Sequence, residues 1–180
     1  MPDKLILQRI FIKFALVIGT VIMIFGLLFI FVKPVENKSS SMAIGRYMAF
    51  PVFKPELGNT YTICLSPDKK KYLNTMSKLG LEAGDCANGY ISLLKQIVAV
   101  PGDIIEITMR GVLVNHQLIA NSQSSTTYNN INLLPLKIGY IHKLVNNEYF
   151  VMGIDPQSYD SRYFGMISQS EITARAIFLR

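Results

Sequence analysis

The sequence LLKQIVAVPGD (residues 93–103) joins a run of strand-forming residues to a turn. The run starts at Ile91 and continues to Val100, and Pro101-Gly102-Asp103 then favours a turn, because proline and glycine suit the backbone angles that turns require. Residues 104–108 (IIEIT) follow as another run rich in β-branched side chains. The whole stretch therefore predicts two consecutive strands separated by a tight turn.

Further short runs of strand-forming residues lie on both sides of this pair. They predict strands at residues 61–65, 112–114, 118–120, 149–152 and 173–179. Asn115-His116-Gln117 separates two of these runs as a hairpin turn. Only residues 67–83 carry apolar side chains at helical spacing. Many short strands and few helices predict a mainly β domain built as a distorted barrel.

Lys95 lies inside the first run, on a face made of alternate residues that are otherwise apolar: Ile91, Leu93, Ile97 and Ala99. Burial disfavours the ammonium form and lowers the pKa of a lysine, and a neutral lysine can act as a general base. The structural alternative is a lysine at a sheet edge whose ammonium group reaches solvent. A partner nucleophile is needed to favour the catalytic interpretation.

Ser41 is the candidate nucleophile, at the end of the run Ser39-Ser40-Ser41. By composition alone, such a run is ordinary linker. The histidines are poor bases for it, because His116 falls at the predicted hairpin turn and His142 has no serine motif nearby. A serine–lysine pair is therefore the main option for nucleophilic catalysis.

The segment GIDPQSYDSRYFG (residues 153–165) follows a predicted strand and gathers polar side chains: Asp155, Ser158, Asp160, Ser161 and Arg162. Asp160 and Arg162 suit a mutual ion pair. The segment is either a solvated turn or a buried network that orients a catalytic group.

Residues 14–32 (FALVIGTVIMIFGLLFIFV) contain no charge and no proline. A helix of ~20 apolar residues crosses the hydrocarbon core of a bilayer, whereas a cleaved signal peptide has a shorter apolar region and a small-residue cleavage site. We therefore predict an uncleaved transmembrane anchor at 14–32, a cytoplasmic lead at 1–13 and a periplasmic domain at 33–180. The orientation rests on more basic residues before the span than after it: Lys4, Arg9 and Lys13 against Lys33 and Lys38.

The chain has a formal net charge of +6 and a sequence pI of about 9.3. Its basic residues are scattered, apart from Lys69-Lys70-Lys71, and no aromatic residues interleave with them, so nucleic acid is not an expected partner. Cys64 and Cys86 can form a disulfide if the domain is exported, and two buried free thiols are the alternative. Because no histidine lies near them, they make no zinc site, and no metal or other cofactor is expected.

The segments SMAIGRY (residues 41–47), LLKQIVAVPGD and GIDPQSYDSRYFG occur in the order and spacing of the signal peptidase I family. Over roughly residues 10–180 the chain resembles the TraF-like peptidases of conjugative plasmids in this family, which implies a signal-peptidase/LexA-like β-barrel. The resemblance implies that Ser41 is the nucleophile, that Lys95 is its base and that the Ser39 hydroxyl assists the oxyanion hole. It also implies that Ser158 and Asp160 position the lysine, and Arg162 fits the same motif.

The function that this resemblance implies is cleavage of a membrane-bound precursor, a pre-pilin or another signal-peptide-bearing protein, through an acyl-enzyme that water or the substrate's own amine releases. The precursor and the lipid bilayer of the bacterial inner membrane are then the expected partners, with Ile44, Met48 and Phe50 dipping into the interface. Two departures, Ala43 in place of a frequent proline and Ile154 in the last motif, keep open a non-catalytic anchored component of a conjugation apparatus. A LexA-like self-cleaving repressor is disfavoured, because a membrane segment stands where its DNA-binding domain would be.

Overall fold

The computed structural model describes residues 2–30 and 32–179, and the chain divides into a unit of residues 1–33 and a unit of residues 34–180. The first unit holds α1 (Pro2–Ile30), and apolar side chains such as Phe11 and Phe14 are exposed on it. Within the described residues, no helix combines the length and the apolarity that crossing a membrane requires. The anchor predicted for residues 14–32 thus stays a prediction, and residue 31 of it lies outside the described residues.

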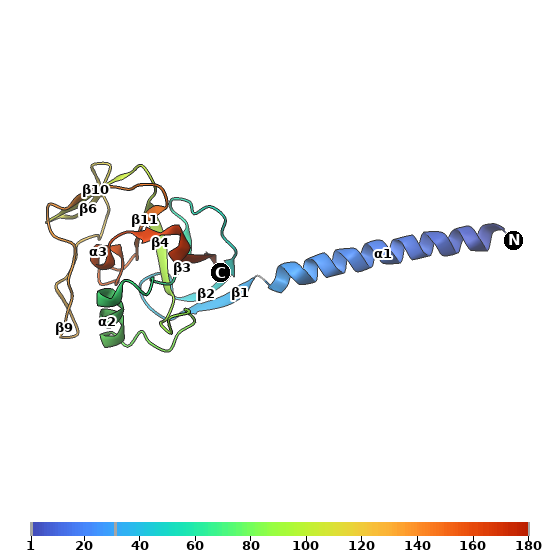
Figure 1. The fold of residues 1–180 in the computed structure, drawn as a ribbon, viewed down its shortest axis with the longest axis horizontal. Coiled ribbons are helices and arrows are strands. Elements are labelled where there is room, and N and C mark those ends of the chain that lie inside the picture. The colour runs from blue at the N-terminus through green and yellow to red at the C-terminus, as the bar shows by residue number, and fades with distance from the viewer. Residues whose placement is uncertain (1, 31, 180) are drawn as a thin grey trace. The chain divides into compact units, whose positions relative to one another are not determined.

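The second unit is built mainly of antiparallel strands, which confirms the predicted mainly β class (Figure 1). Its largest sheet has the strand order β1-β2-β13-β3-β4-β11-β12. The members are β1 (Lys33–Asn37), β2 (Gly45–Phe50), β3 (Thr60–Ile63), β4 (Leu93–Ala99), β11 (Glu148–Met152), β12 (Ile167–Ser168) and β13 (Ile172–Phe178). Because β4 lies between β3 and β11, its lysine, Lys95, is not at a sheet edge.

Two smaller sheets complete the strands of this unit. One has the order β10-β5-β6-β7, and the other pairs β8 with β9. Their bounds are β5 (Ile104–Thr108), β6 (Gly111–Val114), β7 (Gln117–Leu118), β8 (Thr127–Tyr128), β9 (Ile131–Asn132) and β10 (Ile141–Lys143). The predicted hairpin is confirmed between β6 and β7, where Asn115 and His116 have φ of 49° and 68°. Asparagine tolerates this left-handed backbone better than most residues, which suits it to the turn.

Helices are short in this unit. The region predicted to be helical at residues 67–83 contains α2 (Lys70–Lys78), which buries Leu73 and Met76 and ends before Gly80, a residue with φ of 72°. Glycine adopts this backbone without steric cost, so the chain turns there. α3 (Ser161–Phe164) and the 3₁₀ turn η1 (Gln169–Glu171) complete the helical elements.

A disulfide joins Cys64, which follows β3, to Cys86, which lies between α2 and β4. It closes the excursion of the chain that contains α2. In the chain-entropy model, a disulfide that closes a loop of this length stabilises the folded state by about 3 kcal/mol, because it restricts the unfolded chain. The bond therefore links the segment that follows α2 to the end of β3 in the largest sheet.

Candidate active site

Lys95 is buried in the centre of the domain, with 2% of its surface exposed. Its Nζ donates a hydrogen bond of 2.8 Å to the Ser158 hydroxyl. The pKa of Lys95 is lowered from 10.5 to about 8, chiefly by burial. The nearby Asp160 and Asp155 carboxylates raise this pKa, whereas the Arg162 charge lowers it further. With this pKa, roughly a tenth of the Lys95 side chains are neutral at pH ~7.

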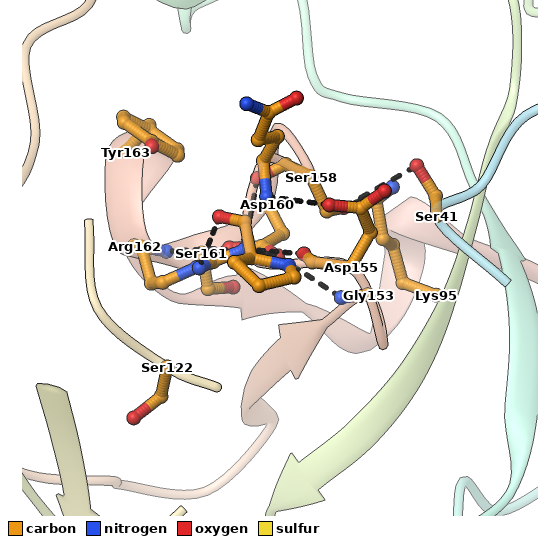
Figure 2. Close-up of polar contacts among 12 residues, drawn as sticks. Ser41, Lys95, Ser122, Gly153, Asp155, Ser158, Asp160, Ser161, Arg162 and Tyr163 are labelled. Atoms are coloured by element: carbon orange, nitrogen blue, oxygen red, sulfur yellow. Dashed lines mark hydrogen bonds and ion pairs between the residues drawn. The ribbon is translucent and has the colours of Figure 1, made fainter. Parts of the chain in front are cut away.

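Ser41 lies in the turn between β1 and β2 and reaches the same hydroxyl (Figure 2). Ser158 Oγ donates to Ser41 Oγ at 3.4 Å, so Ser158 stands between the serine and Lys95. The Ser41 carbonyl accepts a hydrogen bond of 2.8 Å from the Ile154 N–H, which joins the Ser41 turn to the segment that carries Ser158. The structure therefore brings together, from three separate segments, the serine, the lysine and their supporting hydroxyl.

Gly153 lies where these segments approach one another most closely. A Cβ at this position would stand 2.6 Å from Ser158 Cβ and 2.7 Å from the Ser41 carbonyl oxygen. Its N–H donates to Asp160 Oδ2 at 2.9 Å. Only a residue without a side chain allows this approach, which explains why position 153 is a glycine. The sequence motif contains this glycine, but only the folded contacts show the reason for it.

Asp160 and Arg162 form the buried ion pair that the sequence suggested, with both side chains completely inaccessible to solvent. Arg162 donates from Nε to Oδ1 at 2.8 Å and from the terminal nitrogen to Oδ2 at 2.7 Å. Asp160 also caps α3 by accepting from the Arg162 N–H. The paired geometry fixes the orientation of both side chains, as bidentate arginine–carboxylate bonds do.

The remaining donors of Arg162 hold the loop that presents Ser158. They reach the carbonyl oxygens of Pro156 at 2.8 Å, Ser158 at 3.0 Å and Gln123 at 2.8 Å. Arg162 is therefore a positioning residue, because it touches the loop and not the Ser41 hydroxyl. Asp155, in the same loop, accepts a hydrogen bond from Ser40 that lowers its pKa and keeps it anionic.

Asn37 is a residue that the sequence analysis missed. Its side-chain nitrogen lies within hydrogen-bonding distance of the carbonyl oxygens of Ser39 at 2.9 Å, Met42 at 3.0 Å and Ala43 at 3.0 Å. Its oxygen accepts from the Ser39 N–H at 3.2 Å and from the Ser39 hydroxyl at 3.0 Å. One buried amide thus holds the whole turn around Ser41. The polar composition of KPVENKSS (residues 33–40) suggests a tether, but residues 33–37 form β1, and nothing in this sequence marks Asn37.

Ala43 and Ile154, where the motifs depart from the family, act here through their backbone groups. The Ala43 carbonyl accepts from the Tyr47 hydroxyl at 2.9 Å and from Asn37, and the Ile154 N–H holds the Ser41 carbonyl. The histidines stay apart from Ser41: His142 pairs with Glu148 at 2.7 Å, and His116 sits at the hairpin turn.

Two hollows open beside Ser41. The larger has a volume of about 590 Å³ and the smaller about 170 Å³. Both are bordered by Ser39, Ser41, Leu81 and Tyr159. Lys95 lines only the larger hollow and Ser158 only the smaller.

The chain belongs to the family described as "Signal peptidase, peptidase S26", which matches residues 6–179. "Plasmid transfer protein TraF" of Escherichia coli is 27% identical over 139 residues, which cover 76% of each chain. "Conjugal transfer protein TraF" of Agrobacterium tumefaciens (strain 15955) is 29% identical over 147 residues, which cover 79% of this chain and 80% of the relative. The resemblance to TraF-like signal peptidases is confirmed.

A crystal structure of a signal peptidase I from Enterococcus faecalis V583 is also similar, with 18% identity over 69% of this chain and 97% of that chain. The TM-score of this match is 0.38.

Proposed function

We propose that the chain is a serine endopeptidase in which Ser41 is the nucleophile and Lys95 is its base. The observation that carries this proposal is the hydrogen-bonded series from Lys95 Nζ through Ser158 Oγ to Ser41 Oγ, at 2.8 Å and 3.4 Å. Catalytic hydrogen bonds are often long before substrate binds, so the longer contact fits a resting site.

The direction of these hydrogen bonds suggests how the proton moves. In the charged state Lys95 donates to Ser158, which donates to Ser41. When Lys95 loses its proton, its lone pair can accept from Ser158, and Ser158 can then accept from Ser41. Attack of Ser41 Oγ on the scissile carbonyl therefore passes the serine proton to Lys95 Nζ, and the same route returns a proton to the leaving amine. Water then attacks the acyl-enzyme and frees Ser41.

The negative oxygen of the tetrahedral intermediate needs donors that point at it. We propose the Ser41 N–H and the Ser39 hydroxyl for this role. The Ser39 hydroxyl donates to Asn37 in the resting structure, so it must rotate when the intermediate forms. One donor of this kind contributes about 3–4 kcal/mol to the transition state of a comparable protease.

The proposed substrate is a secreted precursor, a pre-pilin or another protein of conjugative transfer, which is cut beside small residues. The names of the two TraF relatives, which refer to plasmid and conjugal transfer, support this choice. Release of the acyl-enzyme by the substrate's own amine, which would give a cyclic product, belongs to the same proposal.

We place the peptidase domain outside the cytoplasm, held at the bacterial inner membrane by residues 14–32. The uncharged apolar sequence of this segment supports the anchor, and the disulfide between Cys64 and Cys86 fits an oxidising compartment. Ile44, beside the Ser41 turn, is 66% exposed and can enter the lipid interface, whereas Met48 and Phe50 are only partly exposed. Carbonate-resistant fractionation with membranes tests the anchor: release of the full chain by carbonate contradicts it.

Processing of a candidate pre-pilin in membranes tests the proposed activity. Wild type, Ser41→Ala and Lys95→Ala are compared, and product masses are read by mass spectrometry. We expect wild type alone to cleave, and a product lighter than the linear fragment by one water would show cyclisation. Processing that survives Ser41→Ala would instead favour the non-catalytic role in a conjugation apparatus.

A further inference from the structure

The smaller hollow beside Ser41 has an apolar wall made by separate segments. Leu79 and Leu81 follow α2, Tyr128 lies on β8, and Leu133 follows β9. Leu79 and Tyr128 border this hollow and not the larger one. A peptide attacked at Ser41 leaves that serine in two directions, and Ser41 borders both hollows, so each hollow can receive one side of the scissile bond.

The larger hollow is lined by residues 34–37 of β1, an edge strand, with Lys38 after it, and by residues 91–95, of which 93–95 begin β4. An edge strand offers free backbone groups that can pair with an extended peptide. The smaller hollow is lined instead by side chains from a helix end and a short hairpin. The two hollows thus differ in what they can bind: extended backbone in one, and a single apolar side chain in the other.

Polar groups in the lining of the smaller hollow, and the Asp155 carboxylate behind that lining, match an amine. Ser158, which holds Lys95 Nζ, lines it. The Asp155 carboxylate accepts from the Gln157 N–H at 2.8 Å and from Ser40, and both of these residues line the hollow. A hydroxyl that can pass on a proton and a carboxylate that is anionic suit a leaving amine, which gains one proton as the bond breaks and a second from water to become an ammonium group.

We infer that the smaller hollow binds the amine side of the scissile bond: its apolar wall holds the side chain that follows the bond, and Asp155 attracts the ammonium group. The inference rests on the proposed peptidase function. Tyr128 is then a specificity-determining residue, and it limits the size of the side chain that follows the bond.

The same hollow admits an amine that attacks the acyl-enzyme. The amine nitrogen forms a bond to the acyl carbon, the bond from that carbon to Ser41 Oγ breaks, and the amine proton returns to Ser41 Oγ through Lys95 and Ser158. No electrons are exchanged with any other group. The division of the acyl-enzyme between attack by water and attack by an amine is therefore set in this hollow.

The first experiment uses the full chain in detergent micelles and two mixtures of decapeptides. One mixture varies the residue after an alanine at the cleavage site (Ala, Leu or Phe), and the other varies the residue before the bond. The variants are Tyr128→Ala and, as a matched control in the larger hollow, Ile91→Ala. Both side chains are about 37–38% exposed, so both variants are expected to fold. Ratios of products are compared within each variant, so a change in total activity cancels.

We expect Tyr128→Ala to raise cleavage before Phe relative to cleavage before Ala by about 10-fold, because an added side-chain volume in an apolar pocket typically changes rates by this order. Ile91→Ala should change only the preference for the residue before the bond. The inference fails if Tyr128→Ala changes the preference for the residue before the bond and not for the residue after it. It also fails if Tyr128→Ala changes neither preference. If wild type shows no cleavage that depends on Ser41, the proposed function is overturned as well.

The second experiment tests Asp155 with alaninamide as the added amine. The readout is the ratio of amide product to hydrolysed product from one acyl-enzyme, which does not depend on the rate at which that acyl-enzyme forms. We expect Asp155→Asn to lower this ratio by about 2- to 5-fold, in line with the loss of one partly exposed charge contact. An unchanged ratio shows that Asp155 does not attract the amine and overturns that part of the inference.

Discussion

The buried base should make the activity of this chain depend steeply on pH. The pKa of Lys95 is lowered from 10.5 to about 8, chiefly because the side chain is removed from solvent. A lysine with the ordinary value is neutral in only ~0.03% of molecules at pH 7, whereas with a pKa of about 8 it is neutral in ~10%. Burial in β4 therefore increases the fraction of molecules in which Lys95 is neutral about 300-fold at this pH.

The assay is kcat/KM for one decapeptide substrate between pH 6 and pH 10, with the full chain in detergent micelles. This ratio reports the ionisation of the free enzyme. We expect it to rise about 10-fold from pH 7 to pH 9 and then to level off. Asp155→Asn is the control, because Asp155 raises the pKa of Lys95, so its removal should move the midpoint to lower pH.

Stability gives a second readout with a defined sign. Between pH ~8 and ~10.5 the unfolded chain still binds the Lys95 proton while the folded chain has released it, so the free energy of unfolding rises with pH across this window. The total rise is about 3 kcal/mol, and Lys95→Met should remove it. A kcat/KM that does not change between pH 6 and pH 9, or a midpoint near 10, would refute the assignment of Lys95 as a buried base.

Three substitutions test the groups that support the site. Gly153→Ala should abolish cleavage, because its Cβ would meet the Ser158 side chain, and peptide turnover checks this. Asn37→Ala should lower stability by about 1–3 kcal/mol and reduce kcat, since the carbonyl oxygens of Ser39, Met42 and Ala43 lose the Asn37 amide; denaturant unfolding beside turnover measures both. Asp160→Asn should cost about 3–5 kcal/mol because it leaves the Arg162 charge buried without its partner, and an unchanged thermal midpoint would contradict the stabilising role of the pair.

The fold was predictable where local patterns are strong. Residues 93–99 and 104–108 form strands as their composition predicts, and the hairpin turn lies at Asn115 and His116. The helix predicted at 67–83 is shorter, because Gly80 takes a left-handed backbone and ends it. The strands β1, β2, β8, β9, β10 and β12 were missed. Of these, β8, β9 and β12 have only two residues each and so show no alternating pattern.

The sequence by itself determined the β class, the alternation that places Lys95 on an apolar face, and the motifs that identify the family. It left open whether this lysine lies at a sheet edge, because alternation shows which face a residue occupies and not which strands flank it. Only the tertiary structure enclosed Lys95 between β3 and β11 and placed Ser158 against it and Ser41. The roles of Asn37 and Gly153 also came from the folded chain, because their contacts join segments that are distant in sequence or depend on the shape of a folded turn.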